Sequence, residues 1–168
     1  MSPALDVAGK PDARFLLAHP AHFIALGFGA GLAPKAPGTF GTLVAIPIAF
    51  ALWATGSEAL FIATIVLALV VGAWSAQIAG ANLGVSDHGA IVIDEVAAFL
   101  IVLWFAGPAP LHVMLAFVLF RFFDIVKPPP IRWADARWKN GVGVMADDVL
   151  AAAFAVAVFV AVQWIMGT

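Results

Sequence analysis

The sequence predicts an all-α, polytopic membrane protein: a helical bundle of about five crossings with a glycine-rich loop before the first. Hydrophobic residues make up 64% of the 168 residues and charged residues only 11%, whereas soluble domains have roughly half and a quarter. Several apolar runs approach the roughly 20 residues that a spanning helix needs. No polar stretch is long enough to join two domains, so 1–168 is expected to be one domain. Residues 1–20 are expected to form a mobile cytoplasmic N-terminus.

Three of the expected spans are apolar runs of different length. The runs 59–79 and 149–166 contain no charged residue, and both are expected to cross the membrane. The run 43–54 is shorter and contains Pro47. Because proline removes a helical hydrogen bond, this span is predicted to be kinked or to start late.

The other two expected spans, 90–106 and 111–126, form a helical hairpin. They are separated by a Gly-Pro-Ala-Pro turn at 107–110, a composition typical of a tight connection. Each run is long enough to cross only if its charged end lies at the membrane interface.

Alternation of five crossings places the segments 1–42, 80–89 and 127–148 on one side. They contain every Lys and Arg except Arg121, which lies near the same end of its helix. The positive-inside rule therefore predicts that this side is cytoplasmic. The same parity brings most acidic residues to one interface, namely Asp87, Asp94, Glu95, Asp124, Asp135, Asp147 and Asp148.

Asp94 and Glu95 interrupt an apolar run, where an exposed Asp costs about 3 kcal/mol at the centre of a spanning helix. They should therefore face a polar interior, either as an interhelical ion pair with Arg121 or as part of a functional site. Arg121 and Asp124 share one helix face at this spacing, which on its own could be structural. The prolines after Lys127 should end that helix and hold cations beside Asp124.

Asp147 and Asp148 are expected just before the last span, where one carboxylate would cap the helix. Two adjacent carboxylates repel, and a hard cation such as Mg²⁺ is a reason to bring them together. The stretch Gly141-Val142-Gly143 would let the backbone approach a ligand closely. The glycine-rich loop 27–42, with Lys35, is either a phosphate cradle or a packing feature.

Four segments of the sequence carry a shared pattern: 29–42, 87 with 91–95, 120–128 and 143–151. Together they make the chain resemble the phosphatidylglycerophosphatase A family along nearly its whole length after the first twenty or so residues. The resemblance implies a Mg²⁺-dependent hydrolase that converts phosphatidylglycerophosphate into phosphatidylglycerol at the bacterial inner membrane. Departures from the family pattern at Thr42, Ala98, Asn140 and Ala152 remove no charge, although they leave room for a shifted lipid preference.

The charges suggest how such a site would work. Mg²⁺ is expected on some of the carboxylates, where it would neutralise phosphate oxygens and acidify a water. The candidate metal ligands are Asp94, Glu95, Asp124, Asp147 and Asp148, and all but Asp147 are also candidate catalytic residues. The candidate substrate-binding residues are Lys35, Thr39, Asp87, Arg121 and Lys127. Asp94 or Asp148 could act as general base or as a nucleophile.

Composition also limits the partners. A net charge of −2 gives no basic field for nucleic acid, so the expected partners are the lipid bilayer and a phospholipid phosphate. The sequence carries no signal of an oligomeric state. The main alternative is an ion- or proton-coupled transporter that uses the same acids, although acids along a transport path should be staggered through the membrane depth. A structural subunit is a third possibility, and it predicts no metal-dependent activity.

Overall fold

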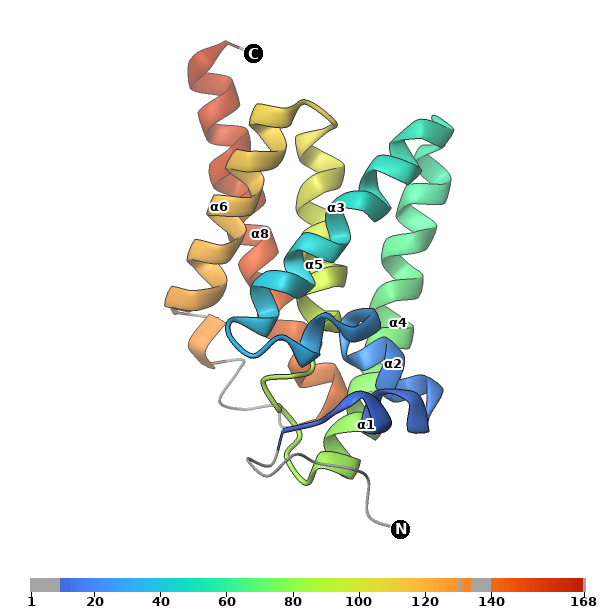
Figure 1. The fold of residues 1–168 in the computed structure, drawn as a ribbon. Coiled ribbons are helices and arrows are strands. Elements are labelled where there is room, and N and C mark those ends of the chain that lie inside the picture. The colour runs from blue at the N-terminus through green and yellow to red at the C-terminus, as the bar shows by residue number, and fades with distance from the viewer. Residues whose placement is uncertain (1–9, 130, 134–139, 168) are drawn as a thin grey trace.

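The computed structural model describes residues 10–129, 131–133 and 140–167, and the described chain is helical and contains no strand. Five long helices make the bundle of Figure 1, which confirms the predicted fold class. They are α3 (Pro37–Thr55), α4 (Glu58–Leu83), α5 (Ile93–Ala106), α6 (Pro110–Val126) and α8 (Gly141–Met166). Asp135, a predicted member of the acidic interface, lies outside the described residues.

Three of these helices, α3, α4 and α8, are long and apolar enough to cross a membrane. The hairpin helices α5 and α6 have 14 and 17 residues, and are shorter than the roughly 20 residues of a typical span. Five crossings therefore stay a prediction. The structure does show the predicted hairpin, with its turn at Gly107 and Pro108.

Helix α5 lies at the centre of the bundle. It packs against α3, α4, α6 and α8, and every residue from Val96 to Leu100 is buried. The Phe99 ring stacks on Phe120 of α6, with their centroids 5.4 Å apart. Because protein surrounds α5, its acidic first turn faces other helices rather than lipid.

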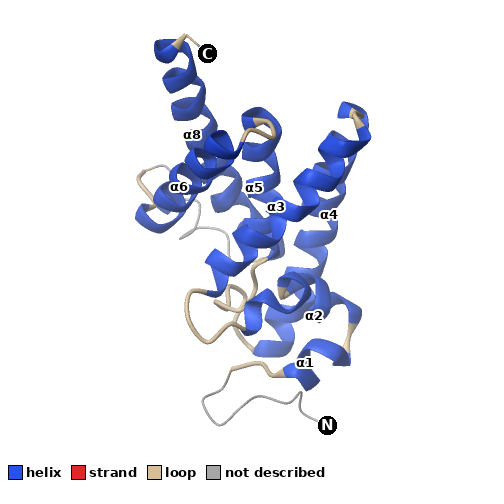
Figure 2. Ribbon diagram, turned by 45° about the horizontal axis from the view of Figure 1, so that its top comes forward, coloured by secondary structure: helices blue, strands red, loops and turns tan. Residues whose placement is uncertain are grey.

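Three short helices precede the bundle and pack near one end of α4 (Figures 1 and 2). They are α1 (Ala13–Ala18), α2 (Pro20–Ala25) and the 3₁₀ helix η1 (Gly27–Leu32). The segment 1–20, expected to be mobile, thus includes α1, whose Phe15 is fully buried. His22 fixes this region, because its ring bonds the Phe15 carbonyl at 2.8 Å and the Asn82 amide at 2.7 Å.

Helix α3 begins at Pro37, six residues before the expected start of the span at residue 43. The last six residues of the supposed loop 27–42 therefore form the first turns of a helix. Gly41 lies against Val92, where an added Cβ would be 2.8 Å from the Val92 Cβ. Such close approach is what small residues provide between membrane helices, and packing explains this glycine.

Helix α8 begins at Gly141, eight residues before the expected start at Val149. Asn140 is its N-cap, since the Asn140 side chain accepts a hydrogen bond from the Gly143 N–H at 2.8 Å. The expectation that Asp147 or Asp148 caps this helix is therefore wrong. Gly141 packs against Ala73 and Gln77 of α4, and its expected approach to a ligand stays a prediction.

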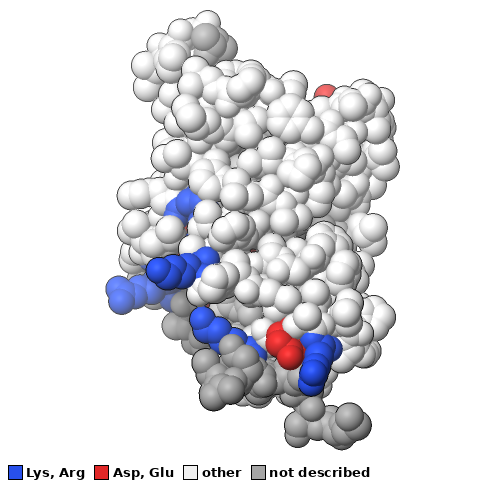
Figure 3. All heavy atoms as spheres, viewed as in Figure 1, with Lys and Arg blue, Asp and Glu red and all other residues white. Residues whose placement is uncertain are grey.

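The connections alternate, so the starts of α3, α5 and α8 lie at the same end of the bundle as the ends of α4 and α6 (Figures 1 and 2). Figure 3 shows Lys and Arg gathered over that lower half, while the upper half is nearly free of charge on this face. The helix directions therefore alternate as the sequence predicted, and passage of all five helices through a membrane stays a prediction.

Candidate functional site

Three carboxylates from two helices meet at the charged end of the bundle, and we call Asp94, Glu95 and Asp148 the acid cluster. One carboxylate oxygen from each lies within 4.8 Å of the others. Asp94 is 8% exposed and Asp148 is 3% exposed. One oxygen of each of the three carboxylates is buried without a hydrogen-bond partner. The cluster thus holds three buried acceptors without partners, an arrangement that needs a positive charge nearby.

Helix geometry places these acids. Asp94 and Glu95 lie in the first turn of α5, where the free N–H groups and the helix dipole favour negative charge. The start of α5 is fixed by a hydrogen bond from the Val92 N–H to the Ala25 carbonyl at 2.9 Å. Asp148 comes from the second turn of α8, which packs on α5.

Arg121 of α6 lies beside the cluster and holds several partners with one nitrogen. Its Nη1 is 2.6 Å from Asp124 Oδ2 and 3.8 Å from Glu95 Oε1, so the predicted pairing on one helix face is confirmed. Of the two acids that were predicted to pair with Arg121 across helices, Glu95 makes the contact. Among the described residues, Asp94 has no cationic partner.

Lys127 forms the second cationic contact. Helix α6 ends at Val126 before the prolines, as predicted, and Lys127 follows in a left-handed conformation with φ 43°. Its Nζ is 2.5 Å from Asp147 Oδ2. The neighbouring aspartates thus have different surroundings, because Asp147 meets Lys127 whereas Asp148 faces Glu95 and Asp124.

The structure does not bring every predicted site residue into this group. Asp87 is exposed in the loop between α4 and α5, and it makes no hydrogen bond or ion pair with a described residue. Lys35 is exposed before α3. Thr39 lies in the first turn of α3, where its N–H donates to the Ala36 carbonyl at 3.0 Å. Their substrate-binding roles stay predictions.

Two residues of the site were missed by sequence reasoning. Thr42 is fully buried, and its hydroxyl donates to the Gly38 carbonyl at 2.9 Å while accepting from Arg121 Nη1 at 3.3 Å. A Cβ at Gly38 would overlap the Glu95 carboxylate. Their spacing of four on a helix was a usable signal, since it places both on one face, but it is visible only once α3 is known to start at Pro37.

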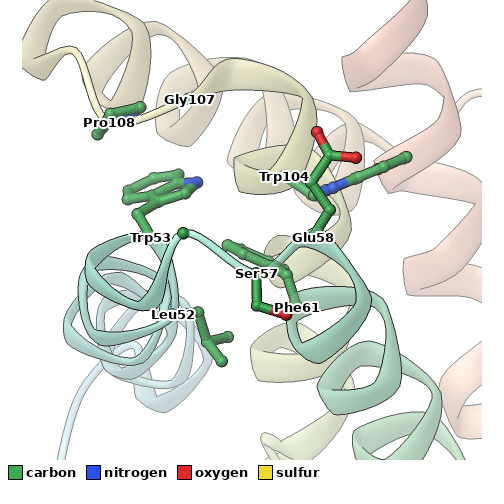
Figure 4. Close-up of a pocket in the computed structure, with 9 residues that line it drawn as sticks. Leu52, Trp53, Ser57, Glu58, Phe61, Trp104, Gly107 and Pro108 are labelled. Carbon is green, nitrogen blue, oxygen red and sulfur yellow. The ribbon is translucent and has the colours of Figure 1, made fainter.

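One cavity elsewhere in the bundle has a different chemistry from the acid cluster. Figure 4 shows this cavity of about 260 Å³ between the α3–α4 and α5–α6 turns, at the opposite end from the acid cluster. Trp53, Phe61 and Trp104 line it, and Glu58 is the one ionisable residue in its lining. A single carboxylate beside aromatic rings offers no group of metal ligands. The acid cluster is therefore the candidate site.

The fold and this site define a helical membrane protein with a buried group of carboxylates and cations at one end of the bundle. The family model for phosphatidylglycerophosphatase A matches residues 23–163. The chain belongs to the phosphatidylglycerophosphatase A family, and is accordingly a phosphoric monoester hydrolase.

Curated relatives agree over nearly the whole length. A phosphatidylglycerophosphatase A of Haemophilus influenzae is 41% identical over 94% of this chain and 97% of its own. The Escherichia coli protein of the same name is 35% identical, with 96% and 94% covered. A putative phosphatidylinositol-3-phosphatase of Bacteroides thetaiotaomicron is also 35% identical, with 86% and 94% covered. No solved structure matches the chain.

Proposed function

We propose that this protein is a Mg²⁺-dependent lipid phosphatase that hydrolyses phosphatidylglycerophosphate to phosphatidylglycerol and inorganic phosphate. The proposed location is the bacterial inner membrane, with the site on the cytoplasmic side. Two relatives are named for this substrate and one for a phosphorylated inositol lipid. The chemistry that these names share is a phosphomonoester on a membrane lipid.

The acid cluster carries the proposal for a metal. Its unpartnered oxygens on Asp94, Glu95 and Asp148 are buried, and oxygen ligands of this kind suit Mg²⁺. These three residues would hold the ion, with Asp124 and Asp147 nearby as further candidates. A bound Mg²⁺ would neutralise phosphate oxygens and lower the pKa of a coordinated water.

The chain's own cations and acids do the rest in this proposal. Arg121 keeps a buried Nε without a partner, so it retains a donor for a phosphate oxygen while Nη1 stays on Asp124. Lys127 supplies a second positive charge at the end of α6. Asp94 and Asp148 have carboxylate oxygens within 4.8 Å of each other, and one of them would act in the reaction. It would accept a proton from a water that attacks phosphorus and displaces the lipid alcohol. Alternatively, it would attack phosphorus itself and displace the lipid alcohol, giving an acyl phosphate that water then hydrolyses to release phosphate.

The distribution of charge favours this function over transport. The segments 59–86, 96–120 and 149–166 contain no charged residue, so in them no acid is staggered between the cluster and Glu58 at the far end. A path for protons or cations would need ionisable side chains at several depths of the membrane.

Phosphate release from lipid vesicles tests the proposal. The purified protein is reconstituted with phosphatidylglycerophosphate or phosphatidylinositol-3-phosphate, with Mg²⁺ or with a chelator. We expect release from phosphatidylglycerophosphate that the chelator abolishes and that Mg²⁺ restores. Full activity in the presence of the chelator would refute the dependence on Mg²⁺. Faster release from the inositol lipid would refute phosphatidylglycerophosphate as the preferred substrate.

A further inference from the structure

We propose that Thr42 is a positioning residue, which fixes the Arg121 guanidinium so that its unpartnered side faces the substrate phosphate. This inference rests on the proposed function and deepens it. Thr42 lies on α3 and Arg121 on α6, helices that otherwise make few contacts with each other. Their hydrogen bond of 3.3 Å therefore spans a sparsely packed part of the site.

The orientation of the Thr42 hydroxyl is determined by its own helix. Its proton goes to the Gly38 carbonyl at 2.9 Å, so the oxygen lone pairs face away from that carbonyl and accept from Arg121. Because Thr42 is fully buried, water does not compete for this position. A long arginine side chain loses rotamer freedom on binding, and a fixed acceptor imposes part of that order before substrate arrives.

The contacts of Arg121 are one-sided. Thr42, Asp124 and Glu95 all approach the same nitrogen, Nη1, while Nε is buried without a partner. Gly38 completes the arrangement, since an added Cβ would be 3.3 Å from Nη1. Fixing one nitrogen of a planar guanidinium fixes the direction of the others. Loss of the Thr42 hydroxyl should therefore misdirect the free donor rather than remove the charge.

Steady-state kinetics of Thr42→Val and Thr42→Ser test this role. We expect Thr42→Val to lower kcat/KM by about 10- to 100-fold, as loss of a supporting hydrogen bond at an active site does, and Thr42→Ser to retain most of the activity. Thr64→Val is the matched control, because Thr64 makes the same intrahelical bond, 2.8 Å to the Leu60 carbonyl, far from any arginine. It should leave kcat/KM unchanged.

A double-mutant cycle with Arg121→Lys separates positioning from general packing. If Thr42 acts through Arg121, Thr42→Val should have little further effect once the guanidinium is gone. The same four proteins are compared by thermal unfolding in detergent, where non-additive changes in Tm report the contact without need of turnover. Additive effects in both measurements, or equal losses in Thr42→Val and Thr64→Val, would overturn the proposal.

The outcomes also separate this inference from the function on which it rests. Wild-type protein that releases no phosphate from any lipid would refute the proposed function, and the role of Thr42 in it. Active wild-type protein with an additive cycle would refute the role of Thr42 alone.

Discussion

At the scale of single residues, the site is a balance of buried charges. Four of its carboxylates, those of Asp94, Asp124, Asp147 and Asp148, belong to residues that are less than a tenth exposed. Arg121 and Lys127 neutralise part of this charge. Burying unpaired carboxylates is costly, so the remaining negative charge is a physical reason for the site to bind a cation.

Substitution of the acid cluster should abolish turnover and weaken metal binding together. Asp94→Asn or Asp148→Asn removes one charge and one strong ligand with little change in size. We expect phosphate release to fall by two orders of magnitude or more, roughly the several kcal/mol that metal-assisted charge stabilisation supplies. Mg²⁺ should raise the Tm of the wild type in detergent, and raise it less in either variant.

Glu58→Gln is the control for these substitutions, because Glu58 is an exposed acid at the far end of the bundle. It should retain both turnover and the Mg²⁺-dependent rise in Tm. Normal activity in a folded Asp94→Asn protein would remove that residue from the mechanism.

Gly38 should tolerate a side chain only if Glu95 moves. A methyl group there would overlap the Glu95 carboxylate, so Gly38→Ala should displace Glu95 and lower activity. Overpacking of this kind typically destabilises a protein by about 1–3 kcal/mol, which thermal unfolding would register. Gly89→Ala is the comparison, since a Cβ at Gly89 meets no atom within 4 Å. Equal effects of the two substitutions would contradict this account.

At the scale of elements, helix boundaries decide which residues reach the site. The early start of α8 moves Asp147 and Asp148 from a cap into the second turn, where they face α5 and α6. The early start of α3 brings Gly38 and Thr42 onto one helix face. Hydropathy alone could not predict either start, because Gly141 and Gly38 are poor helix formers and are held in helices by packing on α4 and α5.

Asn140 should determine how firmly α8 begins. Its side chain accepts from the Gly143 N–H at 2.8 Å, and replacement of an N-cap by Ala typically costs about 1 kcal/mol. We expect Asn140→Ala to lower the Tm in detergent and Asn140→Ser, which keeps a capping oxygen, to lower it less. Val142→Ala, on the exposed face of the same turn, serves as control. An unchanged Tm in Asn140→Ala would show that packing alone sets the start of α8.

At the scale of the whole molecule, the most informative prediction from sequence was that alternating helices bring distant segments to the same end of the bundle. Counting crossings placed Asp94, Asp124 and Asp148 at one end, and the structure confirms it. The chemistry of local pairs was also readable, as with Arg121 and Asp124. Asp87 shows the limit of predicting a site from the side of the membrane alone, because a loop residue on the correct side need not lie in the site. Tertiary packing, which no periodicity encodes, decides such details.

The lack of cysteine in the chain makes sidedness directly testable. Single cysteines are introduced at Val85, which is exposed in the α4–α5 loop, and at Glu58, at the start of α4. A membrane-impermeant maleimide should label Val85→Cys from the cytoplasmic side, and Glu58→Cys from the opposite side. Labelling of both from one side would contradict the alternation of α4 across the membrane.

The shortness of α5 and α6 has a consequence for the surrounding lipid. The 17 residues of α6, which lies on the outside of the bundle, span only about 25 Å, several ångströms less than the hydrocarbon thickness of a bilayer, roughly 30 Å. Along α6 an apolar stripe that includes Leu111, Val118 and Ile125 is exposed, so this side of the bundle should sit in a locally thinned leaflet. Headgroups would dip there toward the carboxylates, which would let a lipid present its phosphate without leaving the membrane.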